Sequence, residues 1–316
     1  MNKPYLLTTL FILIAIVSCF SQNYTKIHQQ SGYKTYTNHQ NQTHVKPKQT
    51  SYKPLPSATT TTSVTTESTQ PVETSVYKTR LLSQDTLSKF KAILVSADVD
   101  GASGAMTQDF INGMKELATS LKEAGVNVTE FYCPNDNWDK IKEACAGSHF
   151  FVYSGHGVYD GSLPPKWVGG LCLTNNFITS ADMQSNLKLA DNAVVVFNHA
   201  CFTAGSSSCD NGADIGITEA HRRVAMYAHP FMDMGFGCYY SNNFYGGAKS
   251  FFDGFLSGNT VNDIYVNTTT PFSKVLEYKD YEFNKSDKIG ISKSGATSYD
   301  LAVVGNPKLS IYDLIK

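Results

Sequence analysis

The sequence lacks an excess of charge of either sign. Its 26 lysine and arginine residues balance 27 aspartate and glutamate residues, and charged residues make up only 17% of the 316-residue chain. No basic block or strongly basic stripe occurs, although such a stripe is typical of proteins that bind nucleic acid. The composition therefore argues against nucleic acid as a partner.

The spacings that indicate a metal site or a serine hydrolase are also missing. No Cys-x-x-Cys or His-x-x-x-His spacing occurs, so we expect no structural zinc, no other metal and no cofactor. Ser206 to Ser208 do not form the Gly-x-Ser-x-Gly turn of many serine hydrolases.

Only one long apolar run is present, and it lies near the N-terminus. Lys3 precedes an apolar segment from Leu6 to Val17, which is too short for a comfortable bilayer span. The small residues Cys19 and Ser21 then resemble a cleavage site. Residues 1–22 are therefore predicted to be an export signal.

The end of this signal allows two kinds of processing. Ile16-Val17-Ser18-Cys19 resembles a bacterial lipobox, which would place a lipid on Cys19, whereas plain cleavage would leave the chain without an anchor. The predicted location is accordingly the periplasm, the cell surface as a lipoprotein, or the exterior. A lipid on Cys19 is the only membrane attachment that we expect.

The next segment, residues 23–80, has a different composition. Gln, Asn, Thr, Ser, Lys and Tyr dominate it, and the stretch from Thr59 to Thr66 is almost entirely Thr and Ser. So little apolar surface cannot offset the entropy lost on ordering, so we predict a disordered tether. An inhibitory prosegment that is later removed is the alternative. Residues 81–316 are predicted to form one folded domain.

Apolar runs and amphipathic stretches alternate from Lys89 onward. This order predicts an α/β fold with right-handed crossovers and a mostly parallel sheet that carries helices on both faces. The predicted strands lie at 92–97, 126–132, 150–157, 171–173, 194–201, 235–240 and 301–304, and the predicted helices at 107–124, 137–147, 180–189, 219–227 and 245–256.

Two of the predicted strands end in reactive side chains. The run from Phe150 leads to His156, which has a glycine on either side, and the run from Val194 leads to Cys201. Nearly unbroken apolar runs are typical of buried parallel strands, and ligands of open α/β sheets bind beyond the carboxyl ends of such strands. A thiol beside an imidazole is the arrangement that nucleophilic cysteine catalysis requires.

These residues carry a resemblance to a known group. Ser154-Gly155-His156-Gly157 resembles the histidine motif of the caspase-like cysteine peptidases, the group of caspases, metacaspases, gingipains, clostripain and CHAT domains, and Ala200-Cys201 resembles their nucleophile motif. The two residues are 45 positions apart, close to the separation of about 50 found in caspases. Gly305-Asn306-Pro307 resembles the Gly-Asp-Pro stretch that closes many such domains. The resemblance covers about residues 90 to 312 and is strongest to bacterial CHAT or gingipain-like domains.

The resemblance implies a caspase-like three-layer sandwich and a cysteine endopeptidase that acts on peptide or protein substrates. His156 and Cys201 would form the catalytic dyad through a thioester intermediate, and the backbone N–H groups of Gly157 and Cys201 would form the oxyanion hole. The chain departs from caspases and metacaspases at His199, where those families carry glutamine or an acid, so the substrate preference stays open.

Further residues are candidates for the substrate pocket. Asp98 follows the first strand and has the charge to recognise a basic side chain, while His199, Trp167 and Phe202 lie near the two motifs. His199 lies two residues before Cys201, so on a strand the two side chains are expected to point to the same side. The sequence assigns no role to Arg222-Arg223, a charged pair in a predicted helix.

Two other functions remain open on these residues. One is a catalytically degenerate binding module of the same fold at the cell surface, and the other is a cysteine-based acyl or amide hydrolase that acts on small molecules. Fold alone does not decide among the three, because function belongs to the site. The presence of both His156 and Cys201 favours an enzyme.

Overall fold

The computed structural model describes residues 82–160, 167–243, 246–268, 273–280, 287–294 and 296–315, and the backbone of two short strands near the N-terminus. The predicted export signal, with Cys19, lies outside the described residues. Within the predicted tether, β1 (Lys34–Thr37) and β2 (Thr43–Lys46) pair antiparallel. The rest of residues 23–80 also lies outside the described residues, so its disorder stays a prediction.

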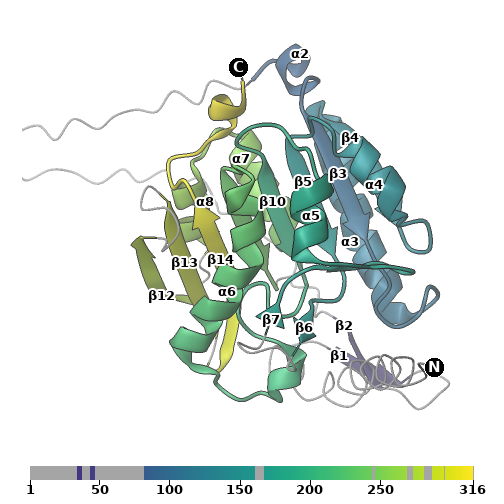
Figure 1. The fold of residues 1–316 in the computed structure, drawn as a ribbon, viewed down its shortest axis with the longest axis vertical. Coiled ribbons are helices and arrows are strands. Elements are labelled where there is room, and N and C mark those ends of the chain that lie inside the picture. Colours follow the sequence, from purple (N-terminus) through teal and green to yellow (C-terminus); the bar gives the residue numbers. More distant parts are fainter. Residues whose placement is uncertain are drawn as a thin grey trace, which may run out of the picture.

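An eight-stranded mixed sheet forms the middle layer of the domain (Figure 1). Five neighbouring strands run parallel, in the order β11 (Cys238–Asn242), β10 (Val194–Asn198), β5 (Phe150–Ser154), β3 (Lys91–Ser96) and β4 (Asn127–Tyr132). Antiparallel strands extend the sheet beyond β11, namely β14 (Ser298–Gly305), β13 (Lys288–Ser294) and β12 (Ser273–Asp280). The predicted α/β class with a mostly parallel sheet is confirmed.

Helices cover both faces of this sheet and give the domain three layers (Figure 1). One face carries α3 (Ala105–Ala124), α7 (Gly247–Leu256) and α8 (Val261–Thr268). The other face carries α4 (Trp138–Ala144), α5 (Ser180–Asn186) and α6 (Gly216–Asp233). Strands β3, β5, β10 and β11 are almost entirely buried on both faces, because each apolar run supplies side chains alternately to the two helix layers.

The longest predicted helix is confirmed in α3. Met114, Leu117 and Leu121 are buried at the helical spacing that predicted them. The helix ends at Gly125, whose φ of 103° is the left-handed conformation that glycine adopts without strain. Its N–H group caps carbonyl oxygens of the last turn.

Helix α6 is longer than predicted. The sequence predicts a helix over 219–227, whereas α6 continues to Asp233 across Pro230. Proline usually ends a helix because it lacks an N–H group. Here the last turn is held by core contacts, since Phe231 is fully buried and its ring meets that of Phe197 edge-on at 5.7 Å.

The antiparallel extension was not fully predicted. Of its strands, only β14 was predicted, because β12 and β13 contain no unbroken apolar run like those of the parallel strands. In β13 apolar and polar residues alternate, and only Ile289 and Ile291 of its larger side chains enter the core. Alternation of this kind is typical of antiparallel strands.

Short elements complete the described domain. They are α2 (Gln84–Leu87), β6 (Tyr159–Asp160), β7 (Trp167–Val168), β8 (Leu171–Cys172), β9 (Phe177–Ile178) and two 3-10 turns, η1 (Ser208–Asp210) and η2 (Ile311–Leu314). None of the helices among the described residues combines the length and apolar character needed to cross a membrane.

Candidate active site

Four neighbouring parallel strands end level with one another. The register pairs their last residues, Ser96, Ser154, Asn198 and Asn242, across β3, β5, β10 and β11. His156 follows the end of β5 by two residues, and Cys201 follows the end of β10 by three. Because β5 and β10 are neighbours, the segments that carry the imidazole and the thiol leave the sheet side by side at one edge.

The two segments touch through main chain. A Cβ atom placed on Gly157 would lie 1.7 Å from the carbonyl oxygen of Cys201 and 2.7 Å from its nitrogen. Only glycine allows this approach. The close neighbour of Gly157 is therefore Cys201 itself.

Tyr153, on β5, holds the segment around His156. Its fully buried hydroxyl accepts the N–H of Cys172 at 3.1 Å and lies 3.0 Å from the carbonyl oxygens of His156 and Cys172. A Cβ atom on Gly155 would lie 2.6 Å from the same hydroxyl. His156 also forms a β-bridge with Cys172. The position of His156 is thus fixed by β8 and by the strand that precedes it.

Burial and the loop after β3 shift the pKa of the His156 imidazole in opposite directions. Burial lowers its pKa below the ordinary 6.5, while a hydrogen bond to the main chain of Val99 and the charges of Asp98 and Asp100 oppose the shift without cancelling it. The N–H of Val99 already donates to Thr107 Oγ1 at 2.9 Å, so its carbonyl is the group that accepts from the ring. A neutral imidazole that donates from one nitrogen carries the lone pair of a base on the other.

Asp98 and Asp100 both accept hydrogen bonds from main-chain N–H groups between β3 and the first turn of α3. Asp98 Oδ1 accepts the N–H of Gly101 at 2.6 Å, and Asp100 accepts the N–H groups of Met106 and Thr107 at 3.1 and 2.9 Å. The Asp100 carboxylate therefore caps the N-terminus of α3, where the N-cap residue has no side chain. Asp98, a pocket candidate, stands near enough to His156 and Cys172 to influence both of their pKa values.

Cys201 is partly buried, and its Sγ lies 3.5 Å from Ser208 Oγ. Its backbone N–H donates to no other described residue, which suits a group expected to bind an oxyanion. Burial raises the pKa of the thiols at Cys133, Cys145, Cys172 and Cys238, that of Cys145 to about 12. All six cysteines of the described residues are free thiols.

The side chains of His199 and Cys201 lie on opposite faces of the sheet, not on the same side as predicted. Strand β10 ends at Asn198, and His199 has a left-handed φ of 58°, so strand alternation does not reach Cys201. The His199 ring stacks on Phe110 of α3 at a centroid distance of 5.4 Å. Cys201 instead packs against the core cluster of the α6 face. The expectation that both side chains point the same way is wrong because the chain turns between them.

The structure describes the side chain of only one of the two aromatic pocket candidates, Phe202 and Trp167. Phe202 is 3% exposed, and its ring stacks on Tyr159 at 5.4 Å with the Arg223 guanidinium 5.1 Å from its centre. These packing contacts, rather than an open cleft, account for Phe202. Trp167 begins β7, but its side chain lies outside what the structure describes.

A row of buried polar side chains was missed by the sequence analysis. Ser96, Ser154, Asn198 and Asn242 are at most 8% exposed, and the side chain of each has a polar atom with no hydrogen bond to a described residue. The alternate residues before them belong to the core under α3 and α7, so the row lies on that face of the sheet. A polar residue at the end of each apolar run was the signal available in the sequence.

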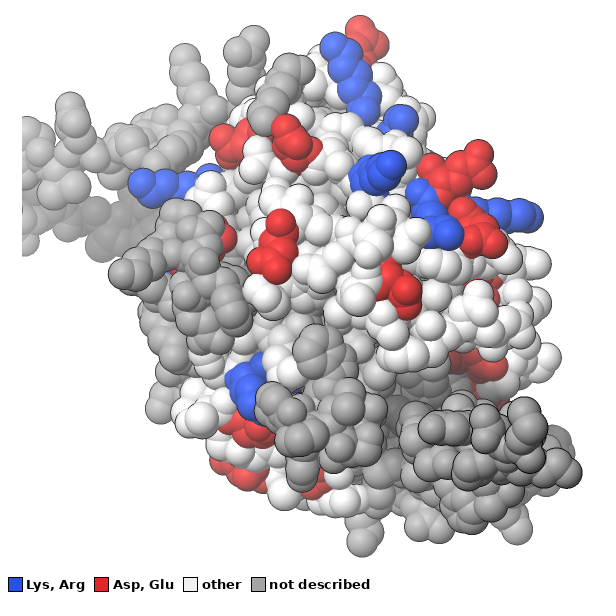
Figure 2. Space-filling view, viewed as in Figure 1, with Lys and Arg blue, Asp and Glu red and all other residues white. Residues whose placement is uncertain are grey.

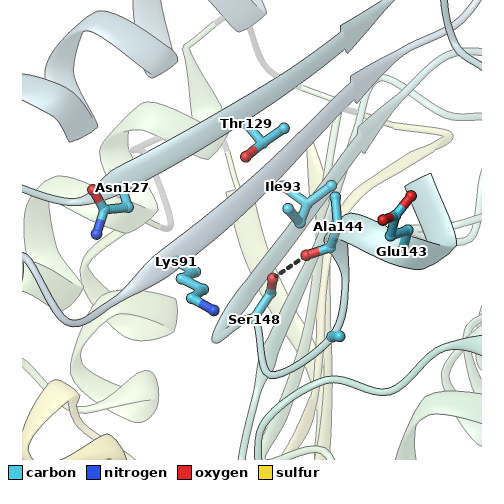
Figure 3. Close-up of a pocket in the computed structure, with 8 residues that line it drawn as sticks. Lys91, Ile93, Asn127, Thr129, Glu143, Ala144 and Ser148 are labelled. Atoms are coloured by element: carbon cyan, nitrogen blue, oxygen red, sulfur yellow. Dashed lines mark hydrogen bonds between the residues drawn. The ribbon is translucent and has the colours of Figure 1, made fainter. Parts of the chain in front are cut away.

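Two cavities in the described part of the chain lie away from His156 and Cys201. One, of 460 Å³, is at the opposite end of the strands, where Lys91, Asn127 and Ser148 line it (Figure 3). The other, of 240 Å³, lies between the loop after β4 and Asn175 and Asn176. Neither contains a nucleophile beside a base, so the chemistry points to the edge at His156 and Cys201 rather than to these cavities.

Charge and metal-binding side chains are dispersed. On the face shown in Figure 2, basic and acidic residues are interspersed over a largely uncharged surface. No cluster of three or more His, Cys, Asp or Glu side chains that would hold a metal ion occurs within the described ranges.

Comparison with protein-family models found no match, and comparison with curated proteins found none either.

Proposed function

We propose that the protein is an exported cysteine endopeptidase with a caspase-like fold, in which Cys201 is the nucleophile and His156 the base. The observation that carries the proposal is the contact between Gly157 and the main chain of Cys201, which brings the imidazole and thiol segments together at the carboxyl edge of neighbouring strands. Ligands of open α/β sheets bind at this edge.

The mechanism follows from the chemistry of the two side chains. The neutral His156 takes the proton of the Cys201 thiol, and the sulfur attacks the carbonyl carbon of the scissile peptide. The developing oxyanion accepts hydrogen bonds from the backbone N–H groups of Cys201 and Gly157. When the C–N bond breaks, the leaving amine takes the proton from His156 and an acyl thioester remains. Water, deprotonated by His156, then hydrolyses the thioester and restores the thiol.

A second candidate is a binding module of the same fold that has no turnover. The observation in its favour is that Phe202 is committed to packing, which removes one expected contact to substrate. The two proposals differ in whether the Cys201 thiol reacts.

A peptide probe with a thiol-reactive group and a library of peptide substrates test the proposal. Cys201→Ser and His156→Ala are each expected to abolish labelling and to lower turnover by orders of magnitude, and the double variant to be little worse than either, because the pair acts as one unit. Cys209→Ser is the matched control and is expected to keep turnover. Full peptidase activity in Cys201→Ser, or equal alkylation of Cys201 and Cys209, would favour the binding module.

A further inference from the structure

Arg223 on α6 is almost fully buried beside the segment that follows Cys201, which we call the thiol loop (residues 201–210). Its guanidinium forms a two-pronged ion pair with Asp210, with N–O distances of 2.8 and 2.9 Å, and donates to the carbonyl of Gly205 at 3.1 Å. It also covers the ring of Phe202 at 5.1 Å. One side chain therefore contacts the beginning, the middle and the end of the thiol loop.

The thiol loop is closed by its own hydrogen bonds. The N–H of Phe202 donates to the carbonyl of Ser206 at 2.8 Å, and the N–H of Ser207 donates to Asp210 Oδ2 at 2.8 Å. Ser206 is also tied to β14, because its Oγ accepts the N–H of Tyr299 at 2.7 Å. Asp210 is thus shared between the loop and Arg223. This closed loop places Ser208 Oγ 3.5 Å from the Cys201 sulfur.

The charge of Arg223 is stabilised where it lies. Burial alone would lower its pKa, but the bonds to Asp210 and Glu219 outweigh burial and raise it. Glu219 accepts from Arg223 at 2.9 Å and from Arg222 at 2.7 Å, and these two guanidinium groups lower the pKa of Glu219 to about 2. A bidentate pair with a planar guanidinium fixes distance and angle together, which lysine does not do.

The same face of α6 also contacts the segment that follows His156. Tyr227 lies four residues after Arg223, one helical turn further along the same face. Its buried hydroxyl accepts the N–H of Val158, two residues after His156, at 2.5 Å. A single rigid helix therefore holds the segments that carry both reactive side chains.

We propose that Arg223 is a positioning residue that fixes the Cys201 thiol relative to His156 through the thiol loop. This inference rests on the proposed function for its effect on turnover, but the ordering of the loop is independent of it. Arg223 touches neither sulfur nor imidazole among the contacts described, so its effect passes through Asp210, Gly205 and Phe202.

The test uses the full chain with Arg223→Lys, Asp210→Asn and, as the matched control, Arg222→Lys. The hydrogen bonds of Arg222 to described residues go to Glu219 and Met226, not to the thiol loop. We expect Arg223→Lys and Asp210→Asn to lower kcat about 10- to 100-fold with little change in KM, because small misplacements of a reacting group have effects of that size. Arg222→Lys is expected to keep kcat.

Two further readouts separate positioning from general stability. Amide hydrogen exchange should accelerate in residues 202–209 of the two loop variants while the core strands stay protected. In the same variants Cys201 should no longer be alkylated by iodoacetamide faster than Cys209. Wild-type kcat and unchanged loop exchange in both variants would overturn the role of Arg223. If the wild type turns over no peptide and Cys201 reacts no faster than Cys209, the proposed function fails, while the exchange experiment still decides whether Arg223 orders the loop.

Discussion

The α-carbon of Gly157 lies against the peptide unit of Cys201, and this contact leaves no room for a side chain. It joins the segment after β5 to the segment after β10. The relationship makes glycine at this position a structural requirement of the candidate site and gives the first prediction.

Gly157→Ala is expected to lower the free energy of unfolding by about 1–3 kcal/mol, because the added methyl group meets main chain that is fixed by two strands. The rate of peptide hydrolysis should fall by more than the loss of folded protein accounts for, because the displaced main chain moves His156 away from Cys201. Thermal unfolding and peptide hydrolysis measure both effects. Gly113→Ala is the control: a Cβ there meets nothing within 4 Å, and alanine in a helix should stabilise by about 0.5–1 kcal/mol. Equal behaviour of the two variants would contradict the prediction.

Thr107→Val should disturb His156 from a distance. The buried Oγ1 of Thr107 accepts the N–H groups of Val99 and Asp100 at 2.9 and 3.2 Å, and the carbonyl of Val99 accepts from the imidazole. Valine keeps the shape but leaves two donors unpaired, so we expect a loss of about 1–3 kcal/mol in stability and a lower kcat. Thr107→Ser keeps the oxygen and should restore kcat. A serine variant as impaired as the valine variant would show that packing, not the hydroxyl, matters.

The pH dependence of activity should reflect the lowered pKa of His156. A depressed imidazole pKa means that the folded protein resists protonation, so the base form persists as pH falls, and the acid limb of kcat/KM should have its midpoint below 6.5. Stability should depend on pH in the same direction as activity. The contribution of His156 to the free energy of unfolding is fully present above pH 6.5 and is lost as pH falls through the folded pKa.

Asp98→Asn sharpens this test, because the Asp98 charge raises the pKa of His156. Its removal should move the acid limb to still lower pH, whatever it does to the maximal rate. A pH–rate profile across the acid range measures both midpoints. An acid limb above 6.5 in the wild type, or an upward shift in the variant, would refute the electrostatic account.

Ser154→Ala is expected to raise the free energy of unfolding by about 1 kcal/mol, because its hydroxyl is buried without a hydrogen bond to a described residue. Ser241→Ala is the matched control on β11. Ser241 is equally buried, but its Oγ donates to Thr203 Oγ1 at 2.7 Å, so its loss should destabilise by about 1 kcal/mol. Denaturant unfolding distinguishes the two, and a destabilised Ser154→Ala would show that this hydroxyl has a partner after all.

Sequence patterns alone predicted the layers of the domain and the edge at which the candidate residues meet. The runs that end near His156 and Cys201 are local features, and short, nearly unbroken apolar runs are typical of strands buried on both faces. Because the carboxyl ends of neighbouring parallel strands lie at the same edge of a sheet, the two residues were predicted to meet there. The helix of α3 followed in the same way from Met114, Leu117 and Leu121.

Tertiary structure decided what local pattern does not encode. His199 turns away from Cys201 because the strand ends one residue before it, and Phe202 becomes a packing residue because Arg223 and Tyr159 enclose it. The contacts of Arg223 with Asp210 and of Gly157 with Cys201 join positions 13 and 44 residues apart. Such pairings depend on how several elements pack at once, so only the folded chain determines them.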